Sequence, residues 1–70
     1  MGARELLRRI RWVATIHGWP LKEVQGKGFH LKVWLNGRRT VIPLHSGDLP
    51  IGTFHQIKKD LDLTDAGLDV

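Results

Sequence analysis

The amino-acid sequence predicts a small α+β domain with the element order α-β-β-β-α, a three-stranded antiparallel sheet with two helices on one face. Three observations carry this prediction. Apolar residues recur at helical spacing near both ends, the middle of the chain alternates apolar and polar residues, and Asn36-Gly37 stands inside the alternating region. We expect residues 1–70 to form one domain, because a chain of this length cannot divide its small core in two.

The first helix is expected over residues 4–17. Its apolar positions share one helical face and are Leu6, Leu7, Ile10, Val13 and Ala14. Gly18 follows, and a glycine there can take the left-handed conformation that ends a helix without steric cost. Trp12 should lie about 160° from the centre of the apolar stripe, among arginines. Such an exposed tryptophan either lies along the domain surface or contacts a partner.

Three strands are expected, over residues 19–25, 29–35 and 38–44. Pro20 weakens the first, because a strand tolerates proline only at its start or on a sheet edge. In the second strand His30, Lys32 and Trp34 should face solvent and the alternate positions should face the core. The core-facing residues would be Phe29, Leu31, Val33 and Leu35. Asn36-Gly37 suits a two-residue hairpin, since both of its central positions need a positive φ.

The third strand should finish near Pro43, which has no amide hydrogen to donate to a ladder. A last helix should begin near Thr53, whose hydroxyl can cap the free amides, and its core face would carry Phe54, Ile57 and Leu61. Residues 65–70 are expected to fray. The resulting α-β-β-β-α order is that of double-stranded-RNA-binding domains.

Composition limits the compartment and the chemistry. The chain has no cysteine, which excludes disulfides and thiolate metal sites and makes a reducing cytoplasm the simplest location. No apolar run approaches the roughly 20 residues of a membrane span, so we expect no membrane association. Residues 1–45 carry nine Lys or Arg against Glu5 and Glu23, a net charge of +7, whereas residues 46–70 have a net charge of −3. The basic part would attract a polyanion, although net charge alone also serves solubility.

His30 is the strongest candidate for catalysis. A histidine on a solvated basic face can take a proton from an RNA 2′-hydroxyl or return one to the leaving 5′-oxygen. Candidate phosphate-binding cations are Lys27, Lys32, Arg38 and Arg39. Gly28, like Gly26, would let the backbone approach a phosphate. The bland alternative for a single strand histidine is an ordinary surface residue.

The remaining histidines are weaker candidates. His45 could bind RNA or bond to a turn, His17 fits a helix C-terminus, and His55 lies on the last helix. The four histidines lack metal-ligand spacing, so no metal site is expected. No nucleotide-binding glycine loop or serine or cysteine nucleophile signature occurs either, so we expect no cofactor.

Several motifs resemble the HicA (YcfA-like) family of bacterial mRNA interferase toxins. They are Gly28-Phe29-His30, Ile42-Pro43-Leu44-His45 and Leu49-Pro50-Ile51-Gly52-Thr53, in the family's order and nearly its spacing. The resemblance covers the chain from the first helix to Leu63. It implies a fold like that of double-stranded-RNA-binding domains, an endoribonuclease acting on mRNA with His30 as its acid and base, and inhibition by a HicB-type antitoxin protein. Trp34 and His45 would join the RNA-binding residues.

The sequence departs from the family around His30. Family members have serine or glycine where this chain has Phe29, and often a second histidine where it has Leu31. A shifted register would place Gly28 at the catalytic position and leave the protein inert as a nuclease. Two other readings therefore stand beside the toxin: a non-catalytic RNA-binding module of the same fold, and a protein-interaction domain that keeps the antitoxin contact.

Overall fold

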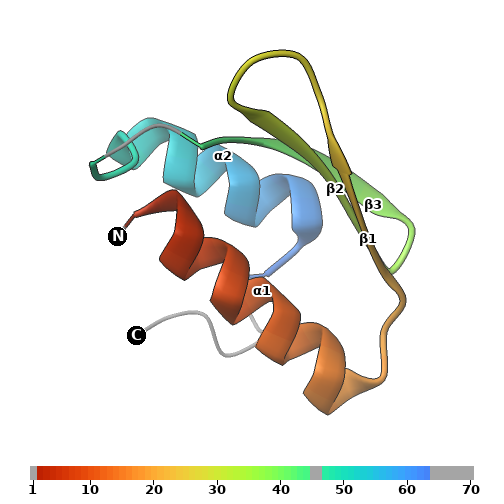
Figure 1. The fold of residues 1–70 in the computed structure, drawn as a ribbon. Coiled ribbons are helices and arrows are strands. Elements are labelled where there is room, and N and C mark those ends of the chain that lie inside the picture. Colours follow the sequence, from red (N-terminus) through yellow and green to blue (C-terminus); the bar gives the residue numbers. More distant parts are fainter. Residues whose placement is uncertain (1, 45–46, 64–70) are drawn as a thin grey trace.

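The computed structural model describes residues 2–44 and 47–63. The elements follow in the order α1 (Ala3–His17), β1 (Leu21–Gln25), β2 (His30–Leu35), β3 (Arg38–Pro43) and α2 (Ile51–Leu61). The strands form an antiparallel sheet in the order β1-β2-β3, and both helices lie on one face of it (Figure 1). The α-β-β-β-α order expected from the sequence is confirmed. Residues 65–70, expected to fray, lie outside the described residues.

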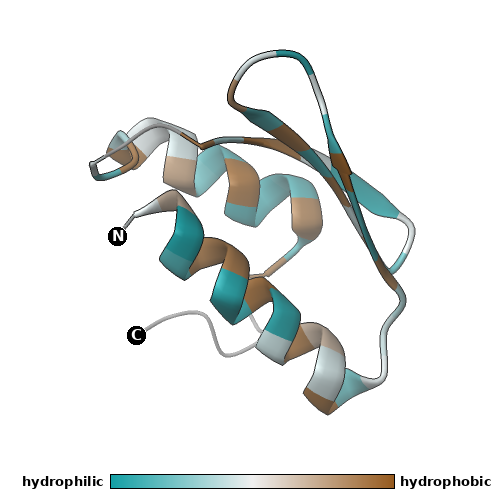
Figure 2. Cartoon of the chain, viewed as in Figure 1, coloured by the Kyte–Doolittle hydropathy of each residue, from teal (hydrophilic) through white to brown (hydrophobic). Residues whose placement is uncertain are grey.

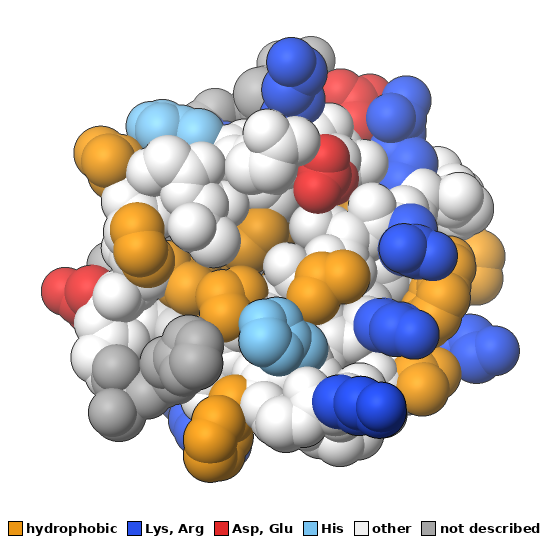
Figure 3. All heavy atoms as spheres, turned by 90° about the horizontal axis from the view of Figure 1, so that it is seen from above, with side chains coloured by type: hydrophobic (Ala, Val, Ile, Leu, Met, Phe, Trp, Pro, Cys, Tyr) orange, Lys and Arg blue, Asp and Glu red, His pale blue; other side chains and the backbone are white. Residues whose placement is uncertain are grey.

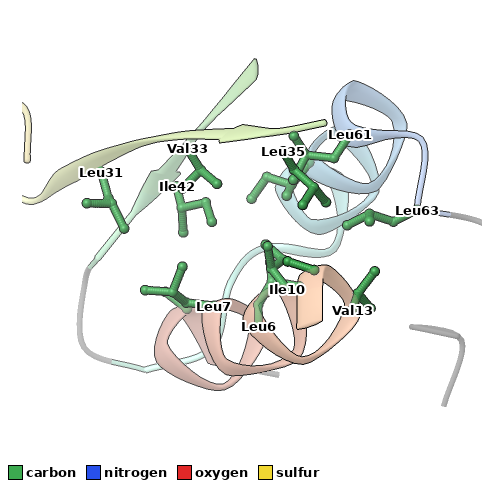
Figure 4. Packing of buried hydrophobic residues seen from close by; sticks show 13 residues of the cluster. Leu6, Leu7, Ile10, Val13, Leu31, Val33, Leu35, Ile42, Leu61 and Leu63 are labelled. Carbon is green, nitrogen blue, oxygen red and sulfur yellow. The ribbon is translucent and has the colours of Figure 1, made fainter. Parts of the chain in front are cut away.

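The core lies between the sheet and the helices. The predicted stripe of α1 is buried throughout, and its residues meet the inward side chains of the strands and of α2 (Figure 4). The fully buried large side chains are Leu6, Ile10, Val13, Val33, Leu35, Ile42, Ile57 and Leu63. Apolar and polar bands alternate along α1 in Figure 2, because only one side of this helix is covered.

Two glycine-containing turns adopt the predicted backbone. Gly18 has φ 67° and closes α1, where its amide donates to the Thr15 carbonyl oxygen at 3.3 Å. Asn36 has φ 51° and Gly37 has φ 84°, which is the pair of left-handed residues that a type I′ turn requires. The short turn fixes the pairing of β2 with β3 from Leu35 opposite Arg38 onward.

Side-chain hydrogen bonds join each helix to the sheet. The Arg11 guanidinium of α1 donates through Nε and Nη2 to the two carboxylate oxygens of Glu23 in β1, at 2.9 and 2.7 Å. On the other side, the hydroxyl of buried Thr40 in β3 donates to Asp60 Oδ2 of α2 at 2.9 Å. Gln56 Nε2 donates to the second oxygen of Asp60 at 2.7 Å. The polar group of Thr40 is thus satisfied inside the core.

Three details of the expected fold are wrong. Phe29 does not face the core: it is 65% exposed, because β2 begins only at His30 and the alternation does not extend into the preceding loop. Trp19 and Pro20 precede β1 instead of belonging to it. The last helix begins at Ile51 rather than Thr53, with Pro50 at its N-cap and no side-chain cap hydrogen bond. Proline sets a backbone φ of −55° there, which suits the entry to a helix.

Candidate nucleic-acid interface

The face of the sheet turned away from the helices carries three cross-strand rows of side chains. Residues directly opposite each other in antiparallel strands project to the same face. Trp34 of β2 lies between Lys22 of β1 and Arg39 of β3. Lys32 lies between two valines, Val24 and Val41, and His30 lies opposite Pro43. These eight residues, Lys22, Val24, His30, Lys32, Trp34, Arg39, Val41 and Pro43, are called the open face below.

The open face is exposed and mixed in character. Lys22, His30, Lys32 and Arg39 are exposed, and Trp34 is half-buried. Val24 and Val41 retain 39% and 38% exposure, which is high for valine in a sheet. Seen from the side of the β1–β2 hairpin, the molecule has Lys and Arg side chains gathered along one flank, with hydrophobic side chains and a histidine beside them (Figure 3). The prediction that His30, Lys32 and Trp34 share one face is confirmed.

His30 lies where the β1–β2 hairpin opens into the sheet. Its carbonyl oxygen accepts a hydrogen bond from the Gly26 amide at 2.8 Å, which closes the hairpin. Its ring Nδ1 lies 3.4 Å from the carbonyl oxygen of Lys27. A hydrogen bond at this distance is long, so it orients the ring only weakly. The contact with the Lys27 carbonyl involves only Nδ1, and not the other ring nitrogen, Nε2.

The hairpin loop of residues 26–29 is tightly built around its glycines. A Cβ atom at Gly26 would approach the His30 carbonyl oxygen to 3.2 Å, closer than most real contacts. Gly28 has φ 65°, a left-handed conformation that side chains rarely adopt. The Gln25 side-chain amide donates to the Gly28 carbonyl oxygen at 3.2 Å. Lys27 is exposed on this loop, near His30 in space but outside the strand rows.

Arg38 is separated from the other candidate cations. It pairs with the inward-facing Leu35, so it projects toward the helix side of the sheet, where its Nη2 lies 3.8 Å from Asp62 Oδ2 just after α2. Arg39, the next residue, projects to the open face. His45 lies outside the described residues.

Four residues of the open face were not predicted from the sequence as part of it: Lys22, Val24, Val41 and Pro43. Their positions follow from the register of the two hairpins, which places them opposite Trp34, Lys32 and His30. Alternation along β1 was the signal in the sequence for two of them, because Lys22 and Val24 are two positions apart and therefore project to the same face.

Other exposed aromatic and histidine side chains lie elsewhere. Trp12 is 55% exposed on α1, as predicted. His17 stacks on Trp19, with ring centroids 4.3 Å apart, at the end of α1, and His55 is exposed on α2. Within residues 2–44 and 47–63, no three His, Asp or Glu side chains are grouped as metal ligands.

No helix in the described part of the chain has the length and apolar character needed to cross a membrane. The comparisons found no match for this chain among protein-family models, curated proteins or solved structures.

Proposed function

We propose that this protein is a metal-independent endoribonuclease of the HicA type that cleaves mRNA on the open face. One observation carries the proposal: His30 lies on the same exposed sheet face as Lys32 and Trp34, and Lys22 and Arg39 lie on either side of Trp34. A histidine beside several cations is a chemically sufficient set for cleaving RNA, because the nucleophile comes from the RNA itself.

The reaction follows from these groups. The imidazole of His30 takes the proton of a ribose 2′-hydroxyl as the 2′-oxygen attacks the adjacent phosphorus. The bond from phosphorus to the 5′-oxygen breaks, and this oxygen takes a proton from the imidazolium of His30, directly or through a water molecule. The upstream fragment keeps a 2′,3′-cyclic phosphate. Lys32 on the neighbouring row and Lys27 on the hairpin would stabilise the negative charge that builds on the phosphoryl oxygens. DNA lacks the 2′-hydroxyl and is excluded as a substrate.

Further support comes from the shape of the domain and from the resemblance. An α-β-β-β-α fold with both helices on one face is compatible with the fold of double-stranded-RNA-binding domains. The motifs shared with HicA toxins also imply a partner, an antitoxin of the HicB type. Such a protein would inhibit by covering the open face, which is basic and accessible.

Cleavage of RNA in EDTA tests the proposal. The wild-type protein should cut single-stranded RNA without a divalent metal and leave a 2′,3′-cyclic phosphate. His30→Ala should lower the rate on the order of 10²- to 10⁴-fold, the usual contribution of one general acid or base, with little change in RNA affinity. His55→Ala is the matched control, because His55 is exposed on α2. Intact RNA at every pH tried would refute the nuclease.

The second candidate is a non-catalytic RNA-binding module that uses the same face. It is favoured by the surroundings of His30. HicA toxins often have a second histidine at the next position, whereas this chain has Leu31 there, which is only 7% exposed and belongs to the core. Of the three described histidines, only His30 lies on the open face. Binding without cleavage in the same assay would select this candidate.

A further inference from the structure

The row Lys22–Trp34–Arg39 differs from the other two rows of the open face in holding an aromatic ring between two cations. The register pairs Trp34 with Lys22 on one side and with Arg39 on the other. Lys22 Nζ lies 5.5 Å from the centroid of the Trp34 ring, a cation–π contact. The two cations therefore place positive charge on either side of Trp34.

Trp34 is suited to stack on a ligand because its side chain is partly held in place. It is half-buried and contacts Lys22, so less rotamer freedom is lost when another ring stacks on it than for a fully exposed tryptophan. Trp12 offers a contrast: it is 55% exposed on α1. The exposed Val24 and Val41 lie in the adjacent row and extend the apolar surface beside Trp34.

A planar ligand that also carries negative charge on both sides fits this row, and a nucleotide has both properties. The base would stack on the indole in place of the Lys22 ammonium, which would turn to one flanking phosphate while Arg39 meets the other. We propose that Trp34 is a base-stacking subsite which restricts the open face to unpaired RNA. This inference rests on the proposed function, because it takes RNA as the ligand of that face.

The position of the subsite relative to the chemistry follows from strand geometry. Trp34 is four positions after His30, which corresponds to about 13 Å along an extended strand. The stacked nucleotide is thus not the one whose phosphate is cleaved, but one a short stretch of single strand away. A duplex cannot bind in this way, because its bases are already paired and stacked and would have to be pulled out. The cleavage position should therefore stay at a fixed distance from an unpaired, stacked base.

Binding to 2′-O-methyl RNA tests the subsite without cleavage, since the attacking hydroxyl is blocked. Trp34→Ala should weaken binding of the single strand roughly 5- to 150-fold, the range for loss of one base–aromatic stack. Trp34→Phe should retain most of the affinity. Trp12→Ala is the matched control and should leave the affinity unchanged. Circular dichroism of each variant checks that the fold is intact.

A scan of abasic positions then locates the stacked base. Removing one particular base should weaken wild-type binding as Trp34→Ala does, and should have no further effect on that variant. The same RNA in a duplex should bind Trp34→Ala and wild type equally. An equal loss on duplex and single strand, no loss on the single strand, or no binding of RNA at all would overturn the subsite. Trp34-dependent binding of the single strand without any cleavage would refute only the nuclease.

Discussion

Glu23 shows how a single side chain can make the stability of this domain depend on pH. Its carboxylate accepts both hydrogen bonds from Arg11, at 2.9 and 2.7 Å, in the paired geometry that suits a guanidinium. These hydrogen bonds lower the pKa of Glu23, and the positive charge of Arg11 acts in the same direction, while partial burial opposes them. The pKa of Arg11 is raised for the same reason.

Because the pKa of Glu23 is lower in the folded than in the unfolded state, the pair stabilises the fold above the ordinary glutamate pKa of about 4.3. This contribution is lost as the pH falls through the lowered pKa. Glu23→Gln should therefore reduce the free energy of unfolding at pH 7 by no more than about 1 kcal/mol, since Arg11 is exposed to solvent and Glu23 is only partly buried. Urea unfolding of the wild-type protein and of Glu23→Gln at pH 7 and pH 3 measures this difference in the free energy of unfolding. A difference between the two proteins that persists unchanged at pH 3 would contradict the assignment.

At the scale of elements, β2 separates two environments with a period of two. Leu31, Val33 and Leu35 are buried against the helices, whereas His30 and Lys32 on the same strand are exposed. A shift of one residue in the pairing would exchange these sets and place charges in the core. The Asn36-Gly37 turn prevents that shift by fixing where the hairpin reverses.

Aspartate substitutions on the two faces should have opposite outcomes. Val33→Asp or Ile57→Asp should unfold the domain, because an unpaired buried charge costs several kcal/mol against a small total stability. Val41→Asp, the matched control on β3, should leave it folded, since Val41 is 38% exposed on the open face. Circular dichroism and thermal melting distinguish the two outcomes. A native melting temperature for both Val33→Asp and Ile57→Asp would mean that the core face is assigned incorrectly.

The elements also show which parts of the structure are predictable from sequence. Periodicity identifies the core face of α1 and of β2, because burial on one side repeats along each element. The neighbours of Lys22 and Arg38 were not predictable in this way, because they depend on how the strands pair and on how α2 packs against the sheet. Lys22 joins the open face through its register with Trp34, while Arg38 is turned toward Asp62. Phe29 was misplaced because alternation does not reveal where a strand gives way to its loop.

At the scale of the whole molecule, a two-layer body with a shortest extent of 17 Å puts charge on both broad sides. Arg39 and Lys32 lie on the open face, whereas exposed Arg8 lies on α1 in the helix layer. The net charge of +7 on residues 1–45 is thus divided between surfaces that cannot contact one RNA strand equally.

The salt dependence of RNA binding shows how much of the positive charge on each of these two surfaces contacts RNA. The logarithm of the binding constant should fall linearly with the logarithm of salt concentration, because phosphate contacts release counterions. Lys32→Glu or Arg39→Glu should reduce the magnitude of the slope by about 0.7 for each phosphate of a single strand that the variant no longer neutralises. Arg8→Glu is the matched charge change on α1 and should reduce it much less. Equal effects of the three variants on the slope would contradict binding of RNA to the open face.

The two outer edges of the sheet bear on how the protein behaves when concentrated. Along β1, residues whose backbone is hydrogen-bonded to β2 alternate with Leu21, Glu23 and Gln25. The backbone amide and carbonyl groups of these three residues point outward at the sheet edge, away from β2. Such an edge is a template on which another copy could add a strand and start an aggregate. Here it is only five residues long and lies between Pro20 and Gly26, while the opposite edge ends at Pro43. A strand added to either edge could form only a few backbone hydrogen bonds before the ladder ended. The short edges therefore disfavour aggregation through strand addition.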